Sequence, residues 1–356
     1  MLPELPEPSA KRAIAFVDGQ NREPRGMRPR ERFLAALHRL PTDRQCVGNC
    51  VSAATIDLME RSGCSFPEAH LEPAVMAGLA ATSYEVLGFD TIAPVFSVHH
   101  EAAALGCTVD WGRRDMMPDA VTHPCRSADD IAIPHDFLQH PAIAVVLDAL
   151  RLLKARYGDE VALIGKVFGP WTLAYHLFGV QDFLMLTLDD PDEVRRILRR
   201  LQPVPILFAG AQREAGADAV TLGDHATGDL VSAGMYEEFL WPLHCELARE
   251  TQAPLILHIC GNTLDRIDLI ARSGLACFHF ESKVPAEEAV RIARGRITLM
   301  GNVNNPELLL RGTPEEVARA AERVRQAGVD IVAPECAVPL STPTANLRAL
   351  VSGARG

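Results

Sequence analysis

The chain has 356 residues, of which 48% are hydrophobic and 23% charged, and its formal net charge is −11. The length suits one large domain with an ample core, and the acidic balance argues against nucleic acid as a partner, because phosphate binding needs a basic face. The longest apolar runs fall far short of the roughly 20 residues of a membrane helix. The N-terminus has no apolar segment followed by a small-residue cleavage site, so we expect a cytoplasmic protein that does not contact a membrane.

Residues 1–26 are rich in Pro, Glu and Arg and lack periodicity, which predicts a flexible tail. Residues 28–40 carry apolar side chains at helical spacing, and we assign 27–356 to a single domain. The nine Cys residues lack the regular spacing of a disulfide framework, so we expect most of them to be reduced. The default role of each is a small buried hydrophobic side chain.

Beyond this helix, short apolar runs alternate with amphipathic helical segments. Eight runs read as strands: 45–52, 90–98, 161–169, 218–225, 254–260, 275–282, 297–303 and 330–336. Eight strand–helix units predict an α/β fold, a parallel (β/α)8 TIM barrel whose strand ends form the active site. Residues 106–124, after the second strand, have the strand and turn residues of an inserted hairpin. An open doubly wound sheet is the alternative, but it usually has a Gly-rich phosphate turn after its first strand, which is missing here.

The fifth predicted strand ends in His258 and Cys260, which point to the same face because side chains alternate along a strand. The eighth predicted strand ends at Cys336, so a barrel would bring all three residues to one mouth. One nitrogen and two sulfurs form a zinc ligand set, and three protein ligands with an open fourth position are typical of catalytic zinc. The alternative is that His258 and Cys260 are core residues that happen to alternate.

Three further strand-end residues are candidates for catalysis. Asp224 and Glu281 end the fourth and sixth strands, where either could be a fourth zinc ligand or a hydrogen-bond partner of His258. The alternative for Asp224 is a salt bridge to a barrel arginine. Lys166 lies near the end of the third strand and could bind an anionic group of the substrate, although a lone strand lysine usually pairs with a neighbouring acid.

Three polar residues are candidates for cofactor binding at the same mouth. His99 and His100 follow the second strand, and Asn302 lies near the end of the seventh. Ordinary core or surface positions are the alternative for the two histidines. For Asn302 the alternative is capping of nearby backbone groups.

Several segments resemble the uroporphyrinogen decarboxylase superfamily, and within it the zinc-dependent methylcobamide:coenzyme M methyltransferases. The resemblance runs from about Arg28 to Leu350 and includes "FGPWTLAYHLFGV", "LHICGNTLDRIDLIARSG" and "APECAVPLSTPTANLRALV". It implies a barrel fold and Zn2+ held by His258, Cys260 and Cys336. It also implies a methylcobamide presented by a corrinoid protein as co-substrate, and a small thiol as methyl acceptor. A homodimer is left open.

The ligand types suit thiol chemistry. Two Cys thiolates and a neutral His would cancel the charge of Zn2+, so a substrate thiolate would keep its electron density and remain nucleophilic. A methyltransferase that takes the methyl group from an ether, amine or thioether donor is one alternative, and a zinc-stabilised binding protein without turnover is another. Decarboxylation is disfavoured, because the end of the first predicted strand has no arginine to hold substrate carboxylates. Three residues near the expected mouth depart from the pattern of the methyltransferases that the chain resembles: His225, Glu335 and Ala337. These departures leave the identity of the thiol open.

Overall fold

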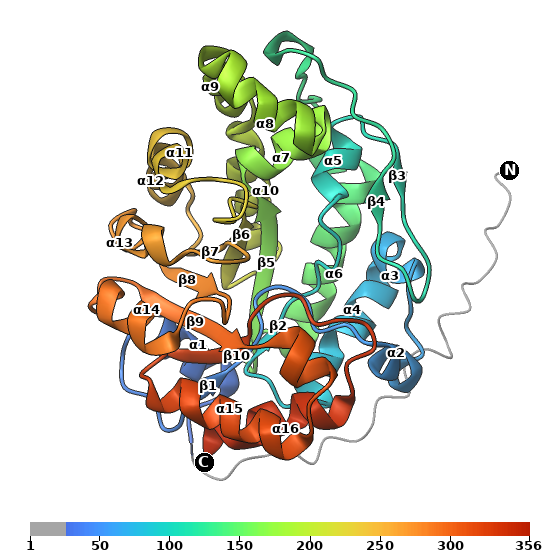
Figure 1. The fold of residues 1–356 in the computed structure, drawn as a ribbon. Helices are drawn as coiled ribbons and strands as arrows, with labels where there is room; N and C mark the ends of the chain where they lie inside the picture. Colours follow the sequence, from blue (N-terminus) through green and yellow to red (C-terminus); the bar gives the residue numbers. More distant parts are fainter. Residues whose placement is uncertain (1–25) are drawn as a thin grey trace, which may run out of the picture.

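A computed structural model describes residues 26–356 of the chain, and the expected tail therefore lies outside the described residues except for Gly26. Within the described part, eight strands form one sheet in the order β1-β10-β9-β8-β7-β6-β5-β2, and each adjacent pair is parallel (Figure 1). The strands are β1 Cys46–Val47, β2 Thr91–Ile92, β5 Ala162–Phe168, β6 Ala219–Gly223, β7 Leu255–His258, β8 Cys277–Phe280, β9 Thr298–Val303 and β10 Ile331–Pro334. The prediction of a (β/α)8 barrel is confirmed.

Helices surround this ring of strands (Figure 1). The principal ones are α1 Pro29–Leu37, α2 Ile56–Ser62, α4 Pro73–Glu85, α5 His100–Ala104, α6 Pro141–Tyr157, α7 Pro170–Phe178, α8 Val180–Asp189, α9 Pro191–Leu201, α10 Pro203–Glu214, α12 Trp241–Glu250, α14 Ala286–Ala293, α15 Pro314–Gln326 and α16 Thr344–Arg355. Many begin with Pro, which is preorganised for the first helical turn. In α15, for example, Thr313 and Glu316 add a reciprocal capping box. No helix in the described part of the chain combines the length and apolarity needed to cross a bilayer.

The first two strands of the barrel are shorter than predicted. Residues 45–52 form a ladder only at Cys46–Val47, because the following segment satisfies its backbone locally. The Asn49 side chain accepts a bond from the Val51 N–H and donates one to the Ser52 carbonyl, at 2.9 and 2.8 Å. These bonds replace strand pairing, so the chain turns away from the sheet early.

The seam between β1 and β2 is closed by hydrogen bonds from a buried aspartate. The backbone N–H of Asp90 donates to the Val47 carbonyl at 2.7 Å, and its Oδ2 accepts from the Val47 N–H at 2.9 Å. The other oxygen, Oδ1, pairs with the fully buried Arg32 of α1 at 2.8 Å. The first helix is therefore tied to the strand ends opposite the mouth.

The interior of the barrel at that end is filled by apolar side chains. Phe33 and Leu37 of α1 pack with an inward-facing layer from the strands, which includes Ile164, Ile256 and Ile331. The helix thus closes the bottom of the barrel, and the C-terminal strand ends remain for the site. The predicted hairpin insertion is also confirmed, because β3 (Val109–Asp110) and β4 (Asp119–Ala120) pair antiparallel.

Candidate metal centre

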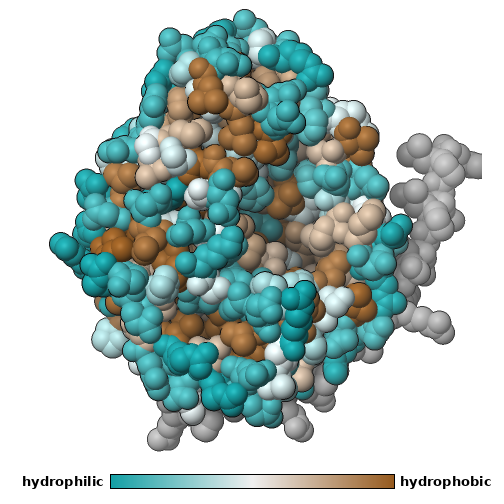
Figure 2. All heavy atoms as spheres, viewed as in Figure 1, coloured by the Kyte–Doolittle hydropathy of each residue, from teal (hydrophilic) through white to brown (hydrophobic). Residues whose placement is uncertain are grey.

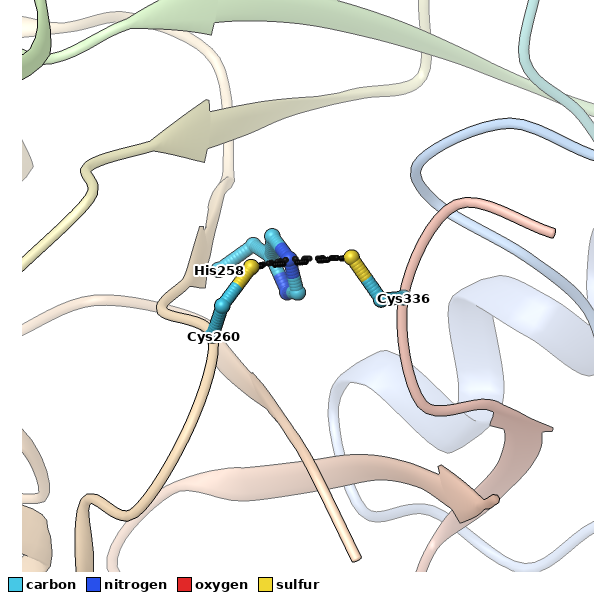
Figure 3. A group of neighbouring side chains, drawn as sticks. All are labelled: His258, Cys260 and Cys336. Carbon is cyan, nitrogen blue, oxygen red and sulfur yellow. Dashed lines mark hydrogen bonds between the residues drawn. The ribbon is translucent and has the colours of Figure 1, made fainter. Parts of the chain in front are cut away.

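His258, Cys260 and Cys336 converge at the C-terminal end of the barrel. His258 is the last residue of β7, and Cys336 lies two residues beyond the end of β10. The His258 Nε2 lies 3.1 Å from the Cys260 Sγ and 3.4 Å from the Cys336 Sγ, and the two sulfurs are 3.5 Å apart. Figure 3 shows the three side chains pointing toward one another from two chain segments. Their juxtaposition, predicted from the strand ends, is present in the structure.

The turn after Cys260 depends on a glycine. Gly261 has φ +79°, in the left-handed region, and a Cβ there would lie 2.1 Å from the Thr227 Oγ1. Only glycine meets both conditions without strain. The turn leaves Cys260 beside His258 while the chain departs from the barrel.

The loop that carries Cys336 is anchored by its neighbour Glu335. The buried Glu335 carboxylate accepts from the Asn305 N–H at 2.7 Å and from the Ser282 N–H at 2.9 Å. These two partners follow β9 and β8, so one side chain links three strand ends. Glu335, noted in the sequence only as unusual, therefore positions the loop of Cys336.

A second histidine, His279, stands directly behind His258. The two residues are paired in the β7–β8 register, and their Nδ1 atoms are 2.8 Å apart. The His279 Nε2 lies 2.8 Å from the Pro334 carbonyl oxygen, and burial lowers the pKa of this fully buried ring to about 3. Sequence reasoning missed His279, although a lone histidine between two phenylalanines in a buried strand was a visible signal.

The two cysteine sulfurs lie 3.5 Å apart, within hydrogen-bond distance for sulfur, and this contact separates their pKa values. The bond from Cys260, with a further contribution from His258, lowers the pKa of Cys336 well below its ordinary value. The same bond to Cys336, together with burial, raises the pKa of Cys260. The first thiolate of the pair thus forms easily at Cys336, as a metal ligand requires.

Glu281 and Asp224 lie in different surroundings. Glu281 is half-buried next to Cys260, and burial followed by the charge of Cys336 raises the pKa of its carboxyl group. Asp224 is buried, with Oδ1 accepting from the Thr172 N–H at 2.9 Å and Oδ2 lying 3.0 Å from the His244 Nε2. Both Asp224 oxygens are therefore engaged by helices α7 and α12, which favours a structural role, whereas Glu281 borders the cluster of His258, Cys260 and Cys336.

Lys166 of β5 is buried inside the barrel. Among the described residues its Nζ has one hydrogen bond, 3.4 Å to the Val51 carbonyl, and no carboxylate within ion-pairing distance. Burial lowers its pKa to about 8, opposed by the charges of Glu101, Cys336 and Cys50. The alternative that Lys166 pairs with a neighbouring acid is thus not what the structure shows.

The three candidates for cofactor binding are all buried. The His99 ring lies 4.8 Å from that of His176, and the His100 ring 5.1 Å from that of Trp111. The Asn302 amide donates to the Val284 carbonyl at 2.9 Å, as in the capping alternative. A role in cofactor binding stays a prediction for all three residues, and the contact of Asn302 favours the structural one.

The donor set fits a zinc ion. Two sulfurs and one nitrogen around a tetrahedral Zn2+ would be about 3.8 Å (S···S) and 3.6 Å (S···N) apart, given usual bond lengths. The observed separations are a few tenths of an ångström shorter, and all three ligand atoms lie within 4.8 Å of one another. Among the described residues, no fourth His, Cys, Asp or Glu belongs to this group.

The sequence profile of the family described as Uroporphyrinogen decarboxylase (URO-D) matches residues 28–356. A methylated-thiol–coenzyme M methyltransferase of Methanosarcina mazei is 34% identical over 91% of this chain and 88% of its own length. The methylcobamide:CoM methyltransferase MtaA of Methanosarcina barkeri is 31% identical over 90% and 96%. A solved methyltransferase structure from Methanosarcina mazei superposes with a TM-score of 0.89 at 30% identity, covering 92% of this chain and 98% of the other.

Proposed function

The chain belongs to the uroporphyrinogen decarboxylase family, and on that premise we propose that it is a methyltransferase that moves a methyl group from a methylated corrinoid protein to a thiol. The support from relatives is that the methyltransferases at 31–34% identity match about nine-tenths of the chain. Decarboxylases of the same family also match, at 29% identity for one from Anaeromyxobacter dehalogenans. The observation that carries the methyltransferase proposal is the cluster of His258, Cys260 and Cys336 at the barrel mouth.

We assign His258, Cys260 and Cys336 to Zn2+ as its three protein ligands. When bound, zinc would supply the Lewis acidity that favours the deprotonated form of a thiol. The chain itself supplies two sulfurs whose negative charge balances the metal, and a neutral imidazole. Cys260 and Cys336 are only partly buried, so a small thiol can approach this side of the cluster. Figure 2 shows that the face above the strand ends is hollowed near its middle.

We assign Lys166 as the residue that binds an anionic group, such as a sulfonate or carboxylate, on the substrate thiol. A buried ammonium without an anionic partner is costly, and a sulfonate or carboxylate on the substrate would offset that cost. The charges of Glu101 and Cys336 both act on the Lys166 ammonium, which is buried in the barrel. A thiol whose sulfur lies at the cysteines would thus direct its anionic group toward the barrel axis.

We assign Glu281 as the group that accepts the proton lost by the substrate thiol. Its carboxyl group has a raised pKa and borders Cys260, so it can accept a proton at the edge of the metal ligands.

A homodimer and a cytoplasmic location stay predictions.

The test is demethylation of methylcobalamin by the zinc-loaded protein with a panel of small thiols. The panel contains an anionic thiol (2-mercaptoethanesulfonate), a neutral one (2-mercaptoethanol) and a cationic one (cysteamine), and the Cys336→Ala variant serves as the control. We expect about one zinc per chain and thiol-dependent loss of the cobalt–methyl bond, fastest with the anionic thiol. Absence of turnover with every thiol, in protein shown to hold zinc, would refute the proposal.

A further inference from the structure

We propose that His279 is a positioning residue that holds the His258 ring in the one tautomer whose Nε2 lone pair is free for a metal. The inference deepens the proposed function and rests on His258 being a zinc ligand. It concerns a residue of β8 that does not itself reach the cluster of His258, Cys260 and Cys336.

The two imidazole rings form a short relay. His258 and His279 are direct neighbours across the β7–β8 pair, with ring centroids 4.7 Å apart. Their Nδ1 atoms are 2.8 Å apart, and the His279 Nε2 is 2.8 Å from the Pro334 carbonyl oxygen. The relay therefore runs from the backbone of β10 through His279 to His258, and both rings are buried.

For two neutral rings, the hydrogen-bond chemistry allows one arrangement of protons. A carbonyl oxygen can only accept, so the His279 Nε2 must carry the proton of that bond. A neutral imidazole then has only its Nδ1 left as an acceptor, and the Nδ1 of His258 must be the donor across the 2.8 Å contact. A neutral His258, the form that a metal requires, consequently carries its only proton on Nδ1, and its Nε2, which faces the Cys260 and Cys336 sulfurs, keeps its lone pair for a metal.

The acceptor carbonyl comes from the segment that carries another ligand. Pro334 is the last residue of β10, two residues before Cys336. One ring thus connects the strand of His258 with the strand that leads to Cys336, so the orientation of the nitrogen ligand is coupled to the position of a sulfur ligand. Hydrogen-bond partners of metal-bound histidines commonly contribute about 10- to 100-fold to metal affinity.

The test compares His279→Leu, which removes both bonds, with His279→Asn, whose amide oxygen can stand near the position of Nδ1 and accept from His258. Zinc affinity is measured by competition with a chromophoric chelator. We expect a loss of about 10- to 100-fold for His279→Leu and recovery of most of that loss in His279→Asn. His70→Leu, which replaces a fully buried histidine stacked on Phe66, is the matched control and should leave zinc affinity unchanged.

A second measurement needs no metal. The 15N chemical shifts of the His258 ring in the zinc-free wild-type protein, recorded at a pH where the ring is neutral, should show a protonated Nδ1 and an unprotonated Nε2, and His279→Leu should lose this single pattern. A neutral His258 ring protonated on Nε2 in the wild type, unchanged affinity in His279→Leu, or equal losses in the Leu and Asn variants would overturn the assignment. Failure of the wild type to bind zinc would instead refute the proposed function, while the tautomer measurement would still decide the role of His279.

Discussion

The two sides of the barrel mouth differ in how completely their buried polar groups are satisfied. On the side of β7, β8 and β10, His258 contacts two sulfurs and His279, and the His279 ring reaches a carbonyl. On the side of β2 and β5, the Lys166 ammonium has a single 3.4 Å bond, and the Glu101 Oε2 has no partner among the described residues. Burial raises the pKa of Glu101 to about 7.

We propose that this difference reflects two functions at one barrel mouth. A site that must hold a metal has to be preorganised, because the ligand atoms are useful only in one geometry. A site that receives a substrate can keep a charged group poorly paired, because the substrate supplies the missing partner. The contrast therefore supports the proposal that the metal binds on one side and the anionic group of the thiol on the other.

Loss of a metal ligand should have the largest effect. In Cys260→Ala and Cys336→Ala we expect zinc affinity and methyl transfer to fall by more than about 100-fold, because even the outer partners of a metal ligand contribute roughly 10- to 100-fold. The circular dichroism spectrum should stay that of a folded barrel, since its core lies below the mouth. Metal analysis and methylcobalamin turnover measure the first effect. An unfolded variant would show that the site is structural, and a fully active variant would show that the residue is not a ligand.

Replacement of Lys166 should weaken binding of an anionic thiol, stabilise the fold and leave the metal side unchanged. For Lys166→Met we expect KM for an anionic thiol to rise about 10- to 100-fold, which corresponds to the loss of a hydrogen bond to a charged group. The free energy of unfolding should rise by roughly 1–3 kcal/mol, because an apolar side chain replaces a buried ammonium. Zinc content should not change. An equal rise in KM for a neutral thiol would argue against an anion site at Lys166.

The pH dependence should report the Lys166 charge. Because burial lowers its pKa from 10.5 to about 8, the ammonium loses its proton as the pH rises through 8. The ratio of kcat/KM for the anionic thiol to that for the neutral thiol should therefore fall above pH 8, and a flat ratio would contradict the assignment.

The lowered pKa of Lys166 should also make stability depend on pH. Between pH 8 and 10.5 Lys166 holds fewer protons in the folded chain than in the unfolded chain, so the free energy of unfolding rises with pH in that window. The stability difference between Lys166→Met and wild type should accordingly shrink there.

The smallest effect is expected at the turn after Cys260. Gly261→Ala should lower the free energy of unfolding by at least about 1–2 kcal/mol, because a residue with a Cβ is strained in the left-handed region and the Thr227 side chain must also move away from that Cβ. Gly210→Ala in helix α10 is the control, since a Cβ there meets open space, and it should stabilise by about 0.5–1 kcal/mol. Urea denaturation of both variants checks the contrast. If Gly261→Ala were as stable as the wild type, the left-handed turn would not be what holds the chain in place after Cys260.

The sequence predicted all eight barrel strands, because buried parallel strands appear as short runs of β-branched residues between helices whose ends carry glycine. It also predicted the inserted hairpin. Strand lengths were less accurate: residues 45–52 pair only at Cys46–Val47, because the Asn49 side chain takes over the backbone bonding that follows. Here hydrogen bonds from a side chain replace those of a neighbouring strand. Whether this happens depends on the adjacent turn, which the hydrophobic periodicity does not reveal.

The alternation of His258 and Cys260 and the strand-end position of Cys336 were enough to predict that these three residues meet, since a closed parallel barrel brings strand ends to one mouth. Which polar neighbours serve the site was decided only by the tertiary structure. Asp224 and Glu281 look alike as strand-end acids, yet Asp224 is engaged by Thr172 and His244 while Glu281 borders Cys260. His279 became significant only when the β7–β8 register placed its ring against His258. The physical reason is that a hydrogen bond depends on the position and direction of two groups from different strands, and neither is contained in the local pattern of one segment.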